Sequence, residues 1–274
     1  MIISEKHRFV FVHIPKCAGT SIRNPLTPFN EWQLAGPPWQ KKNSVLGTLD
    51  YGHIPLFTLR HHFPAEFEAV RDYWSFAVMR DPFDRFASSV SQRLRMYSDQ
   101  PIQKRSLDEV RLVIDESIDY LSRQPREGHL LPPEYIHFQK QVDYIQLDGV
   151  RVLDTIYTVN EINDLLLDVG RRVGQNLGEP GTEGGVTQAN RTVVFRNDLL
   201  RRVIETARPL TDRLGKVLPE SVKQQVRERV YVPRDQRMKD LFEADDVQAF
   251  VLDYYADDIA LCRHVNQHER SDAS

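Results

Sequence analysis

Residues 9–21 read FVFVHIPKCAGTS, and residues 74–88 read WSFAVMRDPFDRFAS. In both segments a short apolar run leads into a turn of charged or small residues, after which the pattern favours a helix. A strand, a turn and a helix in this order build phosphate sites in α/β proteins, because the N–H groups and the dipole at a helix N-terminus attract anions. Two such units in one chain predict a ligand with two separate anionic ends.

The hydrophobic pattern of the whole chain alternates between strand-like and helix-like segments. Short apolar runs predict strands at residues 8–14, 74–79 and 155–158. Amphipathic spacing and turn signals predict helices at residues 20–24, 82–96, 107–123, 160–173, 197–218 and 244–265. We expect Pro25 to end the first of these helices and Asn160 to cap the fourth.

Strands that alternate with helices form right-handed βαβ units and a mainly parallel sheet. We therefore expect an α/β fold, with a central β-sheet flanked by helices, as a single domain over residues 1–266. Residues 267–274 are expected to form a polar C-terminal tail.

The composition is that of an ordinary globular protein. The chain has 274 residues, of which 41% are apolar and 27% charged, which argues against disorder. A net charge of −3 gives no general reason to expect binding to nucleic acid or to membranes. Residues 189–239 carry an excess of Lys and Arg, which could serve an anionic ligand or simply solvate exposed helix faces.

Cysteine usage and the N-terminal sequence bear on the compartment. Cys17 and Cys262 lie far apart in the sequence and predict neither a disulfide framework nor a zinc site. The N-terminus lacks the apolar stretch of a signal peptide, and no segment approaches the run of about 18 apolar residues that a membrane span needs. We therefore expect a cytoplasmic protein without a membrane-spanning helix.

The first turn has the parts of a phosphate cradle. Ala18 and Gly19 keep it slim, so backbone N–H groups can approach an oxyanion, and Thr20 and Ser21 add hydroxyls at the helix N-terminus. Lys16 can place an ammonium on the same group. The order differs from the loop of nucleotide triphosphatases, because the lysine precedes the glycine and the first glycine is absent. The alternative is a plain strand-to-helix turn with one exposed lysine.

The sequence offers little for magnesium-assisted phosphoryl transfer. A kinase holds Mg²⁺ with a loop hydroxyl and an aspartate at a strand end, and the nearest candidate for that aspartate, Asp148, is followed by Gly149. A sulfuryl group carries less negative charge, so its transfer can rely on lysine, hydroxyl and backbone donors, and we expect no metal site. The pattern favours sulfuryl transfer, with a P-loop kinase acting on ATP as the alternative.

Residues 14–21, together with residues 80–85 and Ser88, resemble the sulfotransferases that use 3′-phosphoadenosine-5′-phosphosulfate (PAPS). The carbohydrate branch, similar to heparan and dermatan sulfate 2-O-sulfotransferases, matches best. The resemblance implies a P-loop-like sulfotransferase fold, PAPS as donor with PAP as product, and a hydroxyl acceptor, with a carbohydrate as the best candidate. In that family an arginine and a serine eight residues later hold the 3′-phosphate; these are Arg80 and Ser88 here. The first loop holds the 5′-phosphosulfate, which implies cofactor contacts at Lys16, Cys17, Ala18, Gly19, Thr20 and Ser21.

The resemblance is looser outside these two motifs. Residues 51–53 are similar to the family segment that carries the catalytic histidine, which implies His53 as the base. The family's second histidine, two positions earlier, is replaced here by Tyr51. Residues 188–192 resemble the late loop that closes over the nucleotide, which implies Asn190 and Arg191 as further cofactor contacts.

Sulfuryl transfer to an alcohol needs a base for the acceptor proton and a cation for the leaving oxygen. Histidine is the usual base near neutral pH, so His53 is the first candidate, with His61, His62 or a carboxylate as alternatives. Lys16 suits the second task, because its ammonium can follow the charge that develops on the leaving oxygen. In-line displacement by these two groups is the predicted mechanism.

Several residues near the motifs allow more than one role. Arg85 can reach the 3′-phosphate or brace its turn through Asp81 or Asp84. Trp32 and Trp39 can stack on a sugar ring or fill the core. A non-catalytic module that binds PAP is a further alternative for the whole chain.

Overall fold

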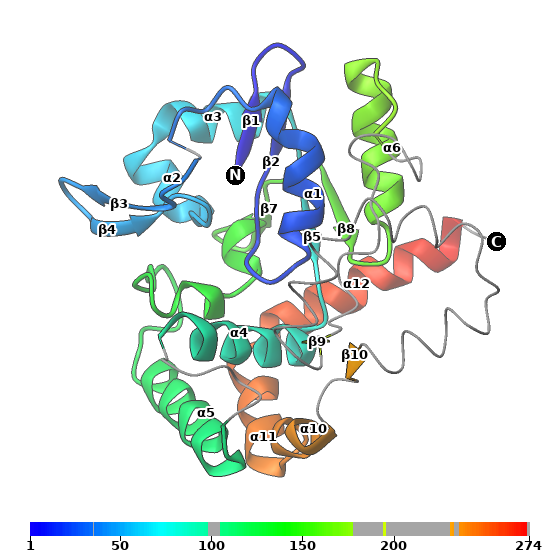
Figure 1. Cartoon of the computed structure of the whole chain (residues 1–274). Coiled ribbons are helices and arrows are strands. Elements are labelled where there is room, and N and C mark those ends of the chain that lie inside the picture. The colour runs from blue at the N-terminus through cyan, green and yellow to red at the C-terminus, as the bar shows by residue number, and fades with distance from the viewer. Residues whose placement is uncertain (35, 98–104, 178–193, 196–230, 233–235, 273–274) are drawn as a thin grey trace. The chain divides into compact units, whose positions relative to one another are not determined.

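A computed structural model describes residues 1–34, 36–97, 105–177, 194–195, 231–232 and 236–272 (Figure 1). The chain forms two units, residues 1–187 with 242–274 and residues 188–241. In the second unit an antiparallel pair is described, β9 (Val194–Phe195) with β10 (Tyr231–Val232). The helix predicted at residues 197–218 and the cofactor contacts Asn190 and Arg191 lie outside the described residues. A single sulfotransferase domain over residues 1–266 stays a prediction.

A four-stranded sheet organises the first unit, in the order β1-β2-β5-β8. Its strands are β1 (Ile2–Ser4), β2 (Phe9–Phe11), β5 (Trp74–Met79) and β8 (Thr155–Thr158). β2 and β5 pair in parallel, as do β5 and β8, whereas β1 is antiparallel to β2. Because parallel strands end at the same edge of a sheet, the loops that follow β2 and β5 meet there.

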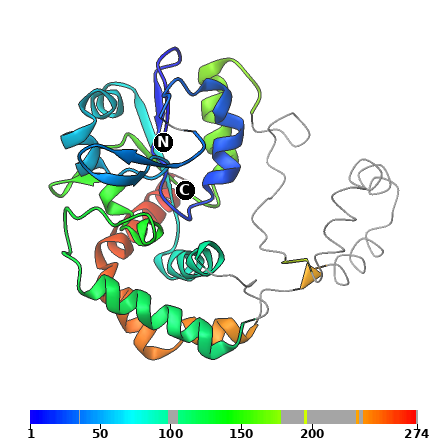
Figure 2. The ribbon, with the colours of Figure 1, turned by 60° about the vertical axis from the view of Figure 1, so that its left-hand side comes forward.

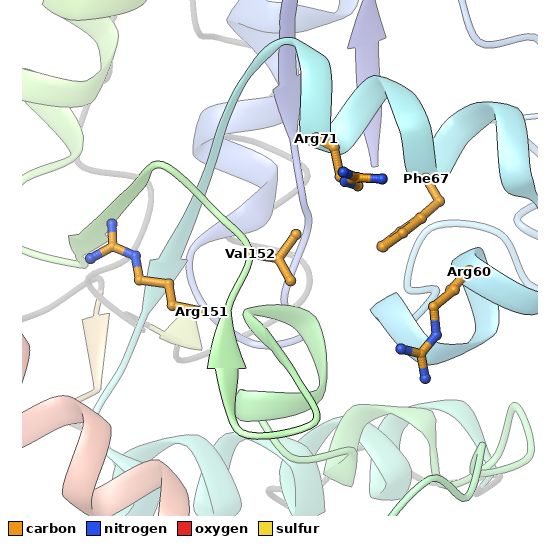
Figure 3. A pocket seen from close by; sticks show the side chains of 5 residues that line it. All are labelled: Arg60, Phe67, Arg71, Arg151 and Val152. Atoms are coloured by element: carbon orange, nitrogen blue, oxygen red, sulfur yellow. The ribbon is translucent and has the colours of Figure 1, made fainter.

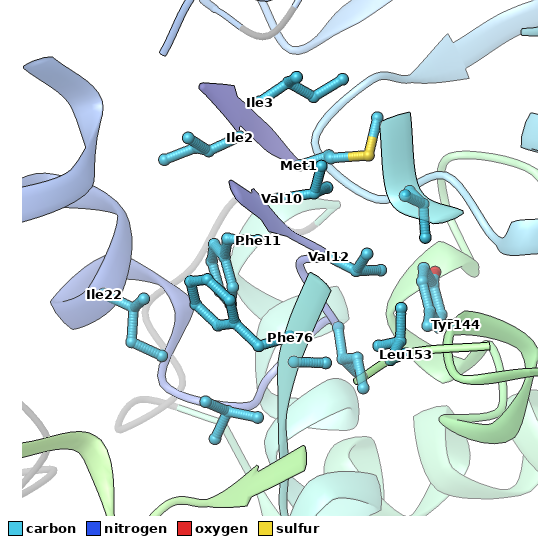
Figure 4. Packing of buried hydrophobic residues seen from close by; sticks show 14 of the residues in the cluster. Met1, Ile2, Ile3, Val10, Phe11, Val12, Ile22, Phe76, Tyr144 and Leu153 are labelled. Carbon is cyan, nitrogen blue, oxygen red and sulfur yellow. The ribbon is translucent and has the colours of Figure 1, made fainter. Parts of the chain in front are cut away.

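Helices cover both faces of this sheet. In Figures 1 and 2, α1 (Gly19–Leu26) and α6 (Ile162–Val173) lie on one side, and α2 (Leu56–His62) with α3 (Pro64–Asp72) lie on the other. The residues of β5 are buried from Ser75 to Met79, as expected for a strand covered on both faces. Figure 4 shows the packing, in which Phe11 and Phe76 stack with ring centroids 5.6 Å apart and Ile22 of α1 lies nearby.

Beyond the carboxyl edge of the strands lies a layer of three mutually packed helices, α4 (Pro82–Met96), α5 (Leu107–Ser122) and α11 (Asp245–Tyr254) (Figure 2). α4 begins directly after β5, because the Asp81 carboxylate accepts hydrogen bonds from the backbone N–H groups of Phe83 and Asp84 at 3.0 and 3.1 Å. Pro82 occupies the first turn, where its missing N–H costs nothing. α4 therefore starts at the same edge of the sheet as α1.

Shorter elements complete the described chain. The β-pairs are β3 (Gln40–Asn43) with β4 (Gly47–Asp50) and β6 (Gln146–Leu147) with β7 (Val150–Arg151). The helical turns are η1 (Thr27–Phe29), η3 (Ile136–Phe138) and η4 (Val142–Tyr144), and the last two α-helices are α10 (Gln236–Phe242) and α12 (Ala256–Asp272). Across the described ranges no helix has both the length and the apolar character that crossing a bilayer requires.

The structure confirms the strands at residues 74–79 and 155–158 and the helix at 82–96, and it corrects three other predictions. Pro25 lies inside α1, which ends one residue later. Asn160 does not cap α6; the helix begins at Ile162, and the preceding Glu161 accepts a hydrogen bond from the backbone N–H of Thr158 at 2.6 Å. Residues 244–265 form two helices, because Tyr255 is buried between them and donates to the carbonyl of Phe138 at 2.9 Å.

Candidate functional site

The loop between β2 and α1 has an unusual backbone. Lys16 and Ala18 both take left-handed conformations, with φ of 65° and 57°, which cost about 1–2 kcal/mol each for residues with a side chain. Ala18 is the N-cap of α1 and makes no side-chain capping bond, so no side chain of the loop covers the first N–H groups of the helix. Strain of this kind is characteristic of ligand-binding loops.

Lys16 points from this loop toward α4. Its ammonium donates to the side-chain oxygen of Gln92 at 3.0 Å. Burial, and after it the neighbouring cations Arg95 and Arg80, lower the pKa of Lys16 to about 8. Three positive side chains thus converge near one loop, and an anion placed there would relieve their repulsion.

Arg80, the residue after β5, reaches the same loop. Its guanidinium lies 3.5 Å from the backbone carbonyl of Lys16 and forms an ion pair with Asp84 at 3.3 Å. Ser88 follows two turns along α4; it is half-buried, and its hydroxyl bonds to no other residue in the described part of the chain. The structure therefore brings the two sequence motifs together at one edge of the sheet.

Three imidazoles form a cluster beside Lys16. The ring of His53 lies 4.3 Å from that of His13 and 5.5 Å from that of His137, measured between centroids. Nδ1 of His53 is 3.1 Å from the carbonyl oxygen of His13. A carbonyl can only accept a hydrogen bond, so Nδ1 carries the proton and Nε2 keeps its lone pair.

The cluster is neutral at ordinary pH. Burial lowers the pKa of His53 to about 3, and the charge on Lys16 contributes to the lowering. Burial also lowers the pKa of His137 to about 3 and that of His13 well below its usual value. Within the part of the chain that the structure describes, no three histidine, cysteine or acidic side chains are grouped so as to hold a metal ion.

Comparison with known proteins identifies the family. Residues 1–146, just over half of the chain, match the sulfotransferase family. This chain belongs to the sulfotransferase family. Neither the curated proteins nor the solved structures contain a match to it. The matched region includes both sequence motifs and the three clustered histidines. The candidate site therefore lies inside the region that matches the family.

His13 and His137 are the residues of this sulfotransferase site that the sequence interpretation missed. The one signal available in the sequence for His13 was its position two residues after β2, whereas His137 lies in η3 and is remote from His53 in the sequence. Tyr51, which replaces the family's second histidine, is 4% exposed and packs edge-on against Phe63.

The alternative bases lie elsewhere on the sulfotransferase. His61 and His62 are exposed at the end of α2, where His61 donates through Nδ1 to the carbonyl of Phe57 in its own helix. They do not join the cluster around His53. The structure thus groups His53 with two partners, His13 and His137, that the sequence did not indicate.

Arg85 does not follow either role considered from the sequence. Its side chain is fully buried, donates to the carbonyl of His137 at 3.1 Å and faces Asp258 at 3.6 Å. Its guanidinium pairs with Asp258 and not with Asp81 or Asp84, and a buried guanidinium cannot reach an anion in an open site. Its hydrogen bond to the carbonyl of His137 helps to hold that residue of the histidine cluster in place.

The two tryptophans also have definite places. Trp32 is 8% exposed and donates through its indole N–H to Glu66 at 2.9 Å, so it belongs to the core. Trp39 is half-buried, and the guanidinium of Arg23 lies 3.6 Å from the centre of its ring. That face of Trp39 is covered by Arg23.

A shallow hollow lies among α2, α3 and β7, lined by Arg60, Phe67, Arg71, Arg151 and Val152 (Figure 3). Its three guanidiniums do not converge on one point, and each has a partner. Arg60 pairs with Asp148 at 2.7 Å, Arg71 with Glu68 at 3.4 Å, and Arg151 donates to the carbonyl of Leu153 at 2.7 Å. The hollow includes no residue of the anion motifs or of the histidine cluster.

Gly19 is required where the anion loop packs against the histidine cluster. A Cβ atom on Gly19 would lie 1.6 Å from Nε2 of His13, so the Gly19→Ala variant must displace that ring. We expect its free energy of unfolding to fall by about 1–3 kcal/mol, the usual cost of overpacking, as measured by denaturant unfolding. Gly36→Ala is the control, since no described atom lies within 4 Å of its added Cβ. Equal stability of the two variants would contradict the packing.

Proposed function

We propose that this sulfotransferase moves a sulfuryl group from PAPS to a hydroxyl of a carbohydrate acceptor. The observation that carries the proposal is the contact between Arg80 and the Lys16 loop, which joins two anion-binding motifs at one edge of the sheet. A nucleotide with phosphate groups at both its 3′ and 5′ positions fits two such subsites. The carbohydrate acceptor rests on the resemblance of the sequence motifs to the carbohydrate branch of the family alone.

The proposed cofactor contacts follow the two motifs. A P-loop-like turn holds the 5′-phosphosulfate through Lys16, Cys17, Ala18, Gly19, Thr20 and Ser21. Arg80 and Ser88 hold the 3′-phosphate, and the unpaired hydroxyl of Ser88 is available for it within the described residues. Cys17 contributes only its backbone, because burial raises the pKa of its thiol to about 12 and it remains protonated. Asn190 and Arg191 complete the proposed set.

The proposed mechanism is an in-line displacement at sulfur. His53 Nε2 takes the proton of the acceptor hydroxyl as its oxygen forms the new bond to sulfur. The bond between sulfur and the bridging oxygen breaks, and the electron pair stays on that oxygen, where the Lys16 ammonium stabilises it. His53 enters this step neutral, and the negative charge of a bound donor raises its basicity above that of the free protein.

The donor is tested by thermal shift with PAP, ATP and ATP plus Mg²⁺. We expect PAP to raise the melting temperature, because a ligand that binds the folded state and not the unfolded state stabilises the folded state. Arg80→Ala should remove most of this shift, since one bidentate phosphate contact is lost, whereas His53→Ala should keep it. Stabilisation by ATP plus Mg²⁺ but not by PAP would instead support a kinase. PAP binding without turnover on any acceptor would support a non-catalytic module.

A further inference from the structure

Gln141 connects the two anion motifs through a single buried amide. Its side-chain oxygen accepts hydrogen bonds from the backbone N–H of Arg80 at 3.0 Å and from the thiol of Cys17 at 3.3 Å. Its side-chain nitrogen donates to the carbonyl of Arg80 at 2.9 Å. The residue has no exposed surface, so these bonds are not exchanged with water and their geometry is fixed.

Gln141 is itself held from the opposite side by α12. Its backbone N–H and that of Val142 donate to the two carboxylate oxygens of Asp258 at 2.9 and 3.0 Å. Asp258 is buried and faces Arg85. α12 contacts β8 and η4, the helical turn that follows Gln141. The support of both anion subsites therefore comes from residues far away in the sequence.

We propose that Gln141 is a positioning residue that sets the separation between the 5′ and 3′ anion subsites. The inference rests on the proposed function, because that function names the ligand. When two subsites are held at the spacing of the two ends of a ligand, the second contact forms at high effective concentration. Loss of the amide would let the Cys17 loop and the Arg80 turn move relative to each other. Ligands with both anions would then lose affinity, while ligands with one anion would not.

The chain supplies a matched control two residues away. Gln139 is also buried, and its amide makes a comparable number of hydrogen bonds. It accepts from the backbone N–H of Leu131 at 2.9 Å and donates to the carbonyl of His129 at 3.0 Å and to Asp143 at 2.5 Å. None of these groups belongs to the anion motifs. Methionine replaces glutamine with similar length and volume, so Gln141→Met and Gln139→Met carry similar packing changes.

The test compares the affinities of three nucleotides: PAP, with both phosphates, adenosine 5′-monophosphate and adenosine 3′-monophosphate. We expect Gln141→Met to lower the affinity for PAP about tenfold or more, while the affinity for each mononucleotide should change by less than about twofold. Gln139→Met should leave the preference for PAP over both mononucleotides unchanged. Isothermal titration gives the three dissociation constants. The inference would be overturned if Gln141→Met lowered the affinity for all three nucleotides equally, or if Gln139→Met lost the preference for PAP to the same extent.

A second variant covers the case in which Gln141→Met does not fold. Cys17→Ala removes the thiol bond to the amide, together with the longer thiol contact to the carbonyl of Pro15 at 3.5 Å. It should cause a smaller, selective loss of PAP affinity; an unchanged PAP preference would count against the inference. The two hypotheses fail in different ways. If the natural protein does not bind PAP, the proposed function is wrong. If it binds PAP and Gln141→Met keeps the full preference for PAP, only the role of Gln141 is wrong.

Discussion

Replacement of His53 by alanine is expected to lower kcat for sulfuryl transfer by about 10²- to 10⁴-fold, the usual contribution of a general base. The affinity for PAP should change little, because the proposed role of His53 is to take the acceptor proton, and within the described residues no hydrogen bond joins its side chain to Lys16, Arg80 or Ser88. The measurement is steady-state turnover with PAPS and a carbohydrate acceptor, combined with PAP titration. A loss of PAP affinity as large as the loss of kcat would show that His53 acts through the fold and not through proton transfer.

The pH dependence gives a second readout for His53. Its pKa of about 3 in the free protein means that the imidazole is already neutral throughout the range above about pH 4. The value of kcat/KM should therefore show no acid limb near pH 6.5, where an exposed histidine would titrate. His61→Ala is the control, because His61 is exposed on α2 and outside the cluster. An acid limb near pH 6.5 that disappears in His53→Ala would contradict the neutral state of His53.

Replacement of Lys16 by methionine is expected to lower kcat by about 10²- to 10³-fold, comparable with the loss of one preorganised group that stabilises a leaving oxygen. Methionine keeps most of the length of the side chain and removes its charge. PAP affinity should also fall, because the same ammonium attracts the 5′-phosphate in the bound state. Lys42→Met, on the exposed side of β3, is the control. Unchanged kcat in Lys16→Met would exclude a role in catalysis.

Lys16 should also produce an alkaline limb. Its pKa is lowered to about 8, first by burial and then by Arg95 and Arg80. The ammonium form exists below this pKa and is lost above it, so kcat/KM for PAPS should fall as the pH rises through about 8. In Lys16→Arg the limb should disappear, because a guanidinium stays charged throughout the accessible pH range. Persistence of the limb near pH 8 in Lys16→Arg would assign it to another group.

The local patterns in the sequence were sufficient for two strands of the sheet, β5 and β8, and for the start of α4, but they did not indicate β1. The run at residues 74–79 is apolar except for Ser75, and its burial from Ser75 to Met79 fits a parallel strand that is covered on both faces. The run at residues 155–158 is shorter and consists of β-branched and aromatic residues, which also favours a strand. Asp81 and Pro82 set the start of α4 by bonds within one turn of the chain. Hydrophobic period and capping act over a few residues, so they can be read without knowledge of the remaining chain.

Longer-range packing decided the points at which sequence interpretation was wrong. The break between α11 and α12 depends on Tyr255, which is buried against Phe86 and the segment around Phe138. No residue in the predicted helix at 244–265 is a glycine or a proline, so no local signal indicated the break. Arg85 likewise lies in a motif that suggests an anion contact, yet its partner, Asp258, comes from the far end of the chain.

The sequence alone determined that two strands, β2 and β5, are each followed by a turn and a helix, and that Lys16 and Arg80 lie in these turns. Only the tertiary structure decided that His13 and His137 flank His53 and that Gln141 joins the Cys17 loop to the Arg80 turn. The physical reason is the range of the interactions. Strands, turns and caps are set by neighbours along the chain, whereas a buried amide or imidazole finds its partners through packing between segments that are remote in sequence.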